Sequence, residues 1–324
     1  MSRVGLVAIG RNEGARLDRC LASLDGLDLI AVYVDSGSSD DSAARARAAG
    51  LHVIQLDDTQ PHTAARGRNA GADYLLSLPD PPELIQFIDG DCAVADGWID
   101  AAIRAMDADP DTDLITGWRS EFHRDASVYN QMCDVEWHQP SGEIRACGGD
   151  LMVRSDAFDA IDGFDARLIC SEDEDFVLRL RKSGRLARRI GRDMTRHDAN
   201  MTRFSQWWRR TLRAGHGFAE VGARHGDHFV AERRRAIGYG MILPVLTLVG
   251  WIALGWPALF LAAAIYAASW WRTAQGLARR GLPTGEARQH AVYYTLAKLP
   301  HALGMALYWW RRYRGTHPQL IEYK

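Results

Sequence analysis

Short apolar runs and amphipathic segments alternate through the N-terminal part of the chain. Four runs are almost uninterrupted, which is typical of strands buried on both faces, at residues 4–9, 30–34, 51–56 and 84–88. Between them, apolar side chains recur at helical spacing, as at Leu17, Cys20, Leu21 and Leu24, and a helix is expected over about 63–78. This alternation predicts an α/β domain with a mostly parallel, doubly wound sheet.

The next elements are read from helix-end signals and short apolar stretches. Ser39 can cap a helix whose first turn carries Asp40 and Asp41 and which ends at Gly50. An amphipathic helix near 98–106 and a strand near 114–117 follow. A polar, aromatic stretch covers 122–140, and a helix is predicted over 172–182.

Three carboxylates are expected at one edge of the sheet. Asp35, Asp89 and Asp91 each follow a predicted strand, and ligands of such sheets bind beyond the strands' carboxyl ends. Asp89-Gly90-Asp91 alone is also ordinary turn chemistry, so the triplet leaves a turn and a metal site both open. Two hard oxygen ligands at this spacing suit Mg²⁺ or Mn²⁺ held with phosphates.

The segment 236–271 contains no Asp, Glu, Lys, Arg or His. One straight helix would reach ~54 Å, too long for a ~30 Å hydrocarbon core, whereas folding at 255–257 gives two arms of ~27 Å each. Arginines precede the first arm and follow the second, so both flanks are expected in the cytoplasm. A buried hairpin in a soluble domain is the alternative.

A second apolar segment, 290–310, is interrupted by Lys298, Pro300 and His301 and is flanked by arginines. A full crossing would leave those arginines on the wrong side, so an interfacial or re-entrant helix is expected. Nothing at the N-terminus resembles a signal peptide, and the N-terminal part is therefore expected in the cytoplasm. The five cysteines show no zinc or disulfide spacing, which favours reduced thiols.

Composition narrows the class of protein further. Hydrophobic residues make up 47% of the chain and charged residues 25%, which is enough for a sizeable core. The net charge of −2 argues against a nucleic-acid-binding protein, which would usually carry a strongly basic domain.

Seven motifs in order resemble those of family 2 glycosyltransferases with the GT-A fold, over roughly residues 3–215. They lie at residues 9–13, 34–40, 65–71, 89–91, 163–165, 172–175 and 197. Two positions depart from the family pattern, because Gly10 stands where proline is common and Ser36 where a second aspartate is frequent. The resemblance implies three domains: a Rossmann-like GT-A domain (1–230), a transmembrane helical hairpin (231–280) and an interfacial helix with a C-terminal tail (281–324).

The same resemblance implies roles for the residues that bind the donor nucleotide. Asp35 would contact the base, with Asn12 and Glu13 nearby, and Asp89 would face the ribose. Arg68, and with it Arg66, would neutralise the diphosphate or orient Asp89, although a solvated helix face explains Arg66 equally well. Arg209 follows a Gln-Trp-Trp stretch similar to a motif of polysaccharide synthases and is a further candidate for the diphosphate.

The metal and the catalytic base are also assigned by resemblance. Asp91 would bind the metal that bridges the diphosphate, together with Asp89 and His197, although a lone histidine is as often structural. Asp173 would take the proton of the acceptor hydroxyl, with Asp175 as the second candidate. The acids around them, Glu172 and Glu174, are also explained by a helix N-terminus, which favours negative charge. A tryptophan pair at a membrane edge is the interpretation favoured for Trp207.

The sequence thus predicts an inverting, metal-dependent hexosyltransferase at the inner (cytoplasmic) membrane, with its catalytic domain facing the cytoplasm. The donor would be a nucleotide-sugar, with a UDP-sugar favoured. The acceptor would be lipid-linked or membrane-associated, as in glycolipid or cell-surface polysaccharide synthesis. Two alternatives differ in class: a nucleotidyltransferase, which would need a Lys-containing phosphate loop that the segment after the first strand lacks, and a non-catalytic scaffold or nucleotide-sugar-binding protein.

Overall fold

The computed structural model describes residues 3–315, which form two compact units. The first takes in the chain up to Ala126 together with Cys133–Asn200, and the second takes in Ser127–Met132 and the chain from Met201 onward. The three domains predicted from the sequence are a separate division and stay a prediction. The last part of the predicted tail, 316–324, lies outside the described residues.

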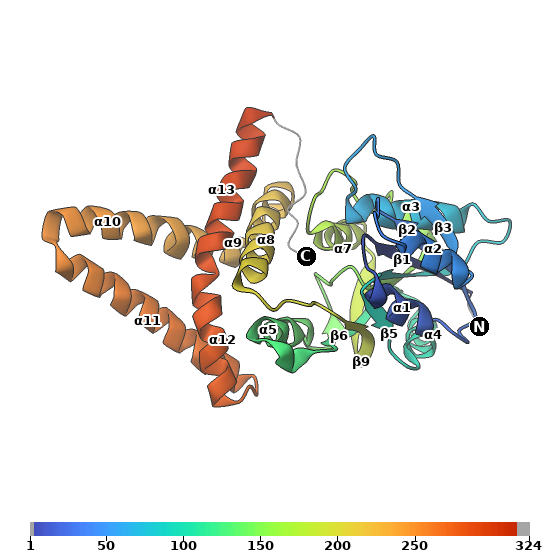
Figure 1. Cartoon of the computed structure of the whole chain (residues 1–324), viewed down its shortest axis with the longest axis horizontal. Coiled ribbons are helices and arrows are strands. Elements are labelled where there is room, and N and C mark those ends of the chain that lie inside the picture. Colours follow the sequence, from blue (N-terminus) through green and yellow to red (C-terminus); the bar gives the residue numbers. More distant parts are fainter. Residues whose placement is uncertain (1–2, 316–324) are drawn as a thin grey trace. The chain divides into compact units, whose positions relative to one another are not determined.

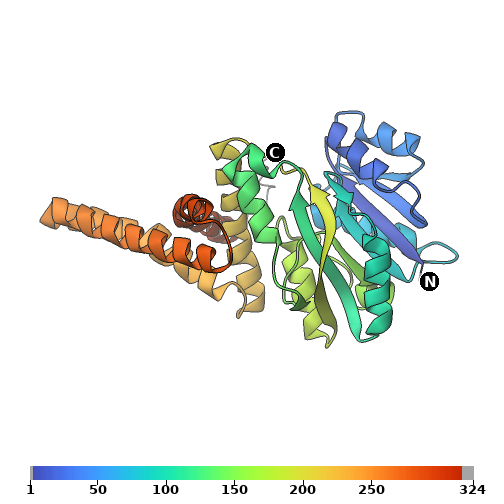
Figure 2. The ribbon, with the colours of Figure 1, turned by 90° about the horizontal axis from the view of Figure 1, so that it is seen from below.

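One sheet runs through the first unit (Figures 1 and 2). Its strands, in spatial order, are β3 (His52–Gln55), β2 (Leu29–Asp35), β1 (Val4–Gly10), β4 (Leu84–Asp89), β8 (Leu151–Arg154), β6 (Thr112–Glu121), β9 (Leu186–His197) and β5 (Cys92–Val94), and the short β7 (Gly142–Glu143) also pairs with β9. The first four are parallel, but β8 is antiparallel to both neighbours and β5 is antiparallel to β9. β6 and β9 are again parallel to each other. The sheet is therefore mixed, and the expectation of a mostly parallel sheet misses the antiparallel strands β8, β5 and β7.

Helices cover both faces of this sheet. The helices of the first 200 residues are α1 (Ala15–Ala22), α2 (Ser42–Ala48), α3 (Ala64–Leu76), α4 (Trp98–Ala108), α5 (Val128–Trp137), α6 (Ser155–Asp159) and α7 (Glu172–Lys182). Alternate residues of β1 enter different cores: Val7 packs with residues of α3 and α7, and Leu6 with residues of α1 and α4. This two-sided burial explains why the strands read as continuous apolar runs.

The observed helix bounds agree with the predicted ones for some helices and differ for others. α7 has the predicted bounds, and Thr63 caps α3 by accepting a hydrogen bond from the backbone N–H of Arg66 at 3.2 Å. α2 differs, because it begins only at Ser42: Asp41, rather than Ser39, stands at the N-cap position, and Asp40 and Asp41 precede the first turn. The stretch 122–140, read only as polar and aromatic, contains α5.

The second unit is helical. Its main elements are α8 (Phe204–His225), α9 (Val230–Ile237), a π-helical turn (Gly238–Ile242), α10 (Leu243–Leu254), α11 (Trp256–Arg279), α12 (Thr284–Leu296) and α13 (Lys298–Arg314). The chain reverses at Gly255, whose φ of +71° suits glycine, and α10 and α11 form a hairpin whose arms diverge from this turn (Figure 1). The hairpin predicted at 255–257 is thus present as a structure. The expected helix over 290–310 is instead split between α12 and α13.

Backbone contact fixes α13 against α8. A Cβ on Gly304 would lie 2.0 Å from the carbonyl oxygen of Leu212, and one on Gly215 would lie 2.2 Å from that of His301. The two helices therefore approach too closely for any side chain at these positions. Trp207 of α8 is only 3% exposed and packs on Tyr129 and Tyr293, so the membrane-edge position expected for it is wrong.

Within residues 3–315, one helical segment is long and apolar enough to span a membrane, Val230–Leu254, and none of its most apolar window is buried. α11 does not pass the same test. Alanine and tryptophan in this helix replace much of the Leu, Ile and Val found in α10, and its C-terminal part contains Arg272 and Arg279. Membrane insertion of the hairpin remains a prediction.

Candidate active site at the carboxyl edge of the sheet

Asp35, at the end of β2, is held by the loop that follows it. Asp35 is 1% exposed. Its carboxylate accepts a hydrogen bond from the hydroxyl of Ser38 and another, at 3.0 Å, from the backbone N–H of Ser38. Asn12, on the loop between β1 and α1, contacts this loop: its N–H donates to Ser38 Oγ at 2.9 Å, and its Oδ1 accepts from the N–H of Ser39 at 2.8 Å. The structure thus brings Asn12 and Asp35 together through Ser38, as the sequence predicted for a nucleotide-binding edge.

Glu13 is buried beside this loop. Its carboxylate pairs with Arg16 at 2.9 Å, and its backbone N–H donates to the hydroxyl of Ser42 at 3.2 Å. Glu13 therefore joins the start of α1 to the start of α2. This position fits a role in shaping the loop around Asn12.

Arg68 joins two of the predicted site segments. Its side chain is 3% exposed, and its guanidinium donates to Asp89 at 2.8 Å and to Glu172 at 2.6 Å. The ring of Phe164 lies against it, 5.4 Å from the guanidinium carbon to the ring centroid. Two charge-assisted hydrogen bonds restrict the buried guanidinium, and the contact with Asp89 fits one of the two roles predicted for Arg68, orienting that carboxylate.

Arg66, two residues earlier on α3, points elsewhere. It donates to the carbonyl of Gln60 at 2.7 Å and to the carboxylate of Asp57 at 3.0 Å. Its contacts therefore fasten the loop before α3, and the structure does not bring it to Asp89.

Two residues that the sequence did not single out complete the surroundings of Asp89. Asp150 is 1% exposed and accepts from the backbone N–H of Asp89 at 3.1 Å and from Thr195 Oγ1 at 2.6 Å. Arg119 of β6 pairs with Asp150 at 2.7 Å and lies 3.4 Å from the second oxygen of Asp89. Asp89 is thus held between Arg68 and Arg119, with part of its side chain open to solvent.

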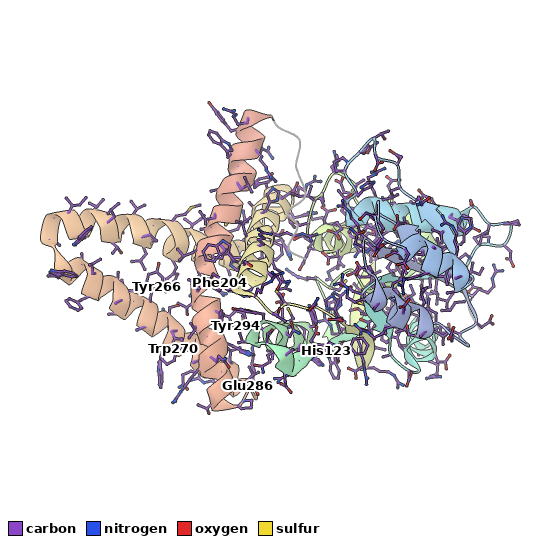
Figure 3. The ribbon with its side chains drawn as sticks, in the orientation of Figure 1. His123, Phe204, Tyr266, Trp270, Glu286 and Tyr294 are labelled. Carbon is purple, nitrogen blue, oxygen red and sulfur yellow. The ribbon has the colours of Figure 1, made fainter. Side chains whose placement is uncertain are left out.

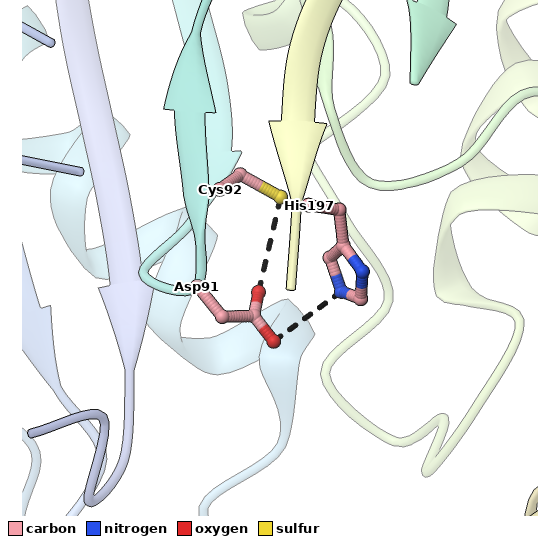
Figure 4. Close-up of side chains that lie close together, drawn as sticks. All are labelled: Asp91, Cys92 and His197. Carbon is pink, nitrogen blue, oxygen red and sulfur yellow. Dashed lines mark hydrogen bonds and ion pairs between the residues drawn. The ribbon is translucent and has the colours of Figure 1, made fainter. Parts of the chain in front are cut away.

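Asp91 and His197 meet where β4 runs into β5 and β9 ends (Figure 4). His197 Nε2 lies 3.3 Å from Asp91 Oδ2, and Cys92 Sγ lies 3.8 Å from Asp91 Oδ1. The other ring nitrogen of His197 lies 3.5 Å from Glu121, a third residue that the sequence did not predict. One ligand atom each of Asp91, Cys92 and His197 lies within 4.8 Å of the others, which is close enough to share one ion.

The charges around His197 favour its protonated form. Burial lowers its pKa, but the carboxylate of Asp91 and the hydrogen bonds to Asp91 and Glu121 outweigh burial, so the pKa is raised above its usual 6.5. In the absence of a cation the imidazolium therefore neutralises Asp91. A divalent cation bound by both side chains would replace that proton.

The acidic start of α7 places two predicted catalytic residues in different surroundings. Burial and the neighbouring charges of Glu172 and Glu174 raise the pKa of Asp173 to about 8. Asp175, by contrast, is 2% exposed and accepts from Arg179 at 2.7 Å, while Arg179 also donates to the carbonyls of Ile161 and Gly163. Asp175 thus supports the 161–163 turn, and Asp173 is the carboxylate with a perturbed pKa.

Arg209, predicted near the diphosphate, lies on α8 in the second unit and is exposed. Its role stays a prediction. Of the residues that the sequence missed, Asp150 had a weak signal, a Gly-Gly-Asp stretch before an apolar run. Arg119 and Glu121 had none, because their approach to Asp89 and His197 follows from the pairing of β6 with β9.

The chain was compared with protein families and with solved structures. Residues 7–157 match the family model "Glycosyl transferase family 2". Among solved structures, the mannosyltransferase PcManGT of Pyrobaculum calidifontis aligns with a TM-score of 0.59 at 18% identity, over 96% of this chain and 88% of that one. The fold is a GT-A glycosyltransferase fold. The family match over residues 7–157 supports a glycosyltransferase.

Other relatives share the fold or part of the sequence. TarS of S. aureus, residues 1–349, aligns with a TM-score of 0.51 at 15% identity, over 98% of this chain and 93% of that one. A TPR repeat-containing protein of Synechococcus elongatus is 37% identical over 89 residues, which are 26% of this chain. The match spans 22% of the length of that curated relative. A longer TarS structure aligns over 74% of this chain and 47% of its own length, with a TM-score of 0.49 at 14% identity.

Proposed function

We propose that this chain is an inverting, divalent-metal-dependent glycosyltransferase that moves a sugar, of the hexosyl type, from a nucleotide-diphosphate sugar to a lipid-linked or membrane-associated acceptor. The observation that carries the proposal is the grouping of its charged side chains. The carboxylates of Asp89 and Asp91, the guanidinium of Arg68 and the acidic start of α7 meet at the edge where ligands of α/β sheets bind.

A divalent cation, Mg²⁺ or Mn²⁺, would be held by Asp91 and His197, with Asp89 beside them. The donor set fits, because a buried carboxylate and an imidazole lie within reach of one ion and Glu121 orients the imidazole from its other side. Bound there, a divalent cation would neutralise the charge of the leaving nucleoside diphosphate. PcManGT was solved with GDP-Man and Mn²⁺, which supports a divalent cation and a nucleotide-sugar donor for this fold.

The donor nucleotide would lie along the two adjoining loops after β1 and β2, which carry Asn12 and Ser38, beside Asp35. The buried carboxylate of Asp35 can accept hydrogen bonds from a base, and Asn12 shapes the loop around it. A UDP-sugar is the donor that we favour, and the GDP-mannose complex of PcManGT makes a GDP-sugar the first competitor.

Asp173 would accept the proton of the attacking hydroxyl. Its pKa of about 8 lies close to neutral pH, which is where a general base both binds and releases a proton effectively. A bound cation or a charged acceptor nearby would lower this pKa and increase the ionised fraction.

The hairpin of α10 and α11 would anchor the enzyme in the inner (cytoplasmic) membrane, with the catalytic unit in the cytoplasm. Exposed apolar side chains line α10, among them Val245, Leu248 and Ile252. Such a surface is costly in water but matches lipid. An enzyme anchored in this way would meet acceptors that are carried on lipids.

The test is release of nucleotide from UDP-, GDP- and dTDP-sugars by the full chain in nanodiscs, with Mn²⁺ or Mg²⁺. We expect one donor to be turned over, and Asp91→Asn and Asp173→Asn each to abolish the metal-dependent release. Asp111→Asn removes an exposed carboxylate on the same unit and is the matched control. Binding of a nucleotide-sugar without turnover in any condition would instead indicate a binding protein or scaffold.

A further inference from the structure

A buried ammonium lies at the base of the helical hairpin, within the second unit. Lys298, at the start of α13, is 9% exposed, and its Nζ donates to Ser269 Oγ of α11 at 2.5 Å. The same Nζ lies 4.5 Å from the ring centroid of Tyr239, in the π-helical turn. Three elements thus converge on one positive charge.

Two arginines add to this charge. Arg272 Nη2 donates to the hydroxyl of Tyr239 at 3.0 Å. Burial, and after it the like charges of Arg235 and Arg272, lower the pKa of Lys298 to about 8, so the ammonium is still mostly charged at neutral pH. Tyr239 is itself held in place, because its carbonyl accepts a hydrogen bond from the hydroxyl of Tyr266 at 2.6 Å. Tyr266 is labelled in Figure 3, on α11.

Few anionic groups balance the cluster of Lys298, Arg272 and Arg235. Within the described part of the chain, neither Lys298 nor Arg272 forms an ion pair with a carboxylate, and Arg235 meets one only at 3.9 Å, that of Glu232. Grouped cations that lack counter-charges repel one another, and burying one of them adds a desolvation cost. An anion from outside the chain would remove both penalties.

We propose that Lys298, Arg272 and Arg235 bind the phosphate of a lipid headgroup at the base of the hairpin. Position favours a lipid over a soluble phosphate, because exposed apolar surface begins directly beyond the cluster. Ile242, Val245 and Leu246 follow Tyr239 along the chain and are each more than half exposed. A lipid whose phosphate is bound by the cluster could lay its acyl chains along this apolar surface. Basic pockets at the cytoplasmic ends of membrane helices bind lipid headgroups in a similar way.

The proposal rests on the membrane association proposed above, but not on glycosyl transfer. The test is flotation of the full chain with vesicles of phosphatidylcholine alone or with added phosphatidic acid. We expect phosphatidic acid to strengthen the association, and Lys298→Gln or Arg272→Gln to weaken that gain by about fivefold each. Arg279→Gln, at the exposed end of α11, removes the same charge and is expected to leave the gain almost intact.

Further variants and conditions keep the result interpretable. Lys298→Arg keeps the charge and is expected to retain the gain, whereas a misfolded variant would be revealed by its circular dichroism. An equal loss of this gain in Arg279→Gln, or no preference for phosphatidic acid, would overturn the proposal. The first result would indicate a diffuse attraction between the basic surface and anionic lipid. Displacement by millimolar inorganic phosphate at constant ionic strength would instead assign the site to free phosphate.

Donor turnover in the same nanodiscs separates this proposal from the proposed function. Nucleotide release without an acceptor requires the first unit, and we expect it to be unchanged in Lys298→Gln. Loss of phosphatidic-acid dependence with intact turnover in the wild-type chain would refute the lipid site alone. Specific lipid binding without turnover of any donor would refute the transferase alone.

Discussion

Arg68 holds Asp89 in place through a 2.8 Å contact between Nη2 and Oδ1. The other terminal nitrogen of Arg68 binds Glu172, so that one guanidinium connects the end of β4 to the start of α7. This geometry ties the predicted ribose-side carboxylate to the helix that carries the predicted base. A change at Arg68 should therefore be felt at both places.

Arg68→Lys is expected to reduce both donor turnover and stability. Lysine keeps the charge but cannot contact both carboxylates in the planar geometry of arginine. We expect a loss of about 1–3 kcal/mol in the free energy of unfolding, together with a higher KM for the donor. Arg66→Lys, two residues away, is the matched control, because Arg66 binds the loop before α3. Equal effects of the two changes would contradict the role given to Arg68.

Gly149→Ala is expected to displace Arg68 without removing any charged group. A Cβ at position 149 would lie 1.9 Å from Arg68 Nη2, whereas the nearest atom to a Cβ at position 148 is 3.8 Å away. Gly149→Ala should therefore lower donor turnover at least as strongly as Arg68→Lys, and Gly148→Ala should have little effect. The two substitutions differ by one position, so their comparison by kcat and KM tests the close packing directly.

Metal affinity should depend more strongly on Asp91 and His197 than on Glu121. Asp91→Asn and His197→Gln remove ligand atoms, and we expect each to abolish the rise in melting temperature on adding Mn²⁺. Glu121→Gln leaves both ligands but loosens the imidazole, so the apparent affinity should fall by about 10- to 100-fold. The readout is a thermal-shift titration, with Asp111→Asn as control. Unchanged titrations in Asp91→Asn would move the metal site elsewhere.

The free energy of unfolding should decrease as the pH rises, because of Asp173. Its pKa in the folded chain is about 8 against 3.8 for an ordinary aspartate, so the folded state favours the protonated form. The stability that this preference contributes is present below pH 4 and is lost as the pH rises toward 8. Asp173→Asn stays neutral, so its melting temperature should exceed that of the wild type by a growing margin between pH 5 and ~8. A constant margin across this range would contradict the raised pKa.

The sequence could predict the parallel half of the sheet and its edge, but not the antiparallel half. Asp35 and Asp89 follow strands with continuous apolar runs, and parallel strands place their carboxyl ends together. Arg119 and Asp150 lie on or beside β6 and β8, whose pairing depends on chain reversals that no local pattern encodes. Their contacts with Asp89 are tertiary.

In the helical unit, too, a feature set by the local sequence could be predicted and one set by tertiary contacts could not. The reversal at Gly255 was predictable, because a charge-free segment of that length must fold or overshoot the bilayer. The burial of Trp207 was not, because an aromatic residue near an apolar segment suits a membrane edge as well as a core. Its partners, Tyr129 and Tyr293, are distant in sequence.

The membrane hairpin can be tested by labelling its two ends in intact cells. Trp256 lies at the turn between α10 and α11 and is 69% exposed, and Arg279 ends α11. If the hairpin spans the membrane, Trp256→Cys should react with a membrane-impermeant maleimide added outside, and Arg279→Cys only after lysis. The five native cysteines are buried, so background labelling should be low. Protection of both positions until lysis would instead place the hairpin on the cytoplasmic side, as expected for a soluble domain.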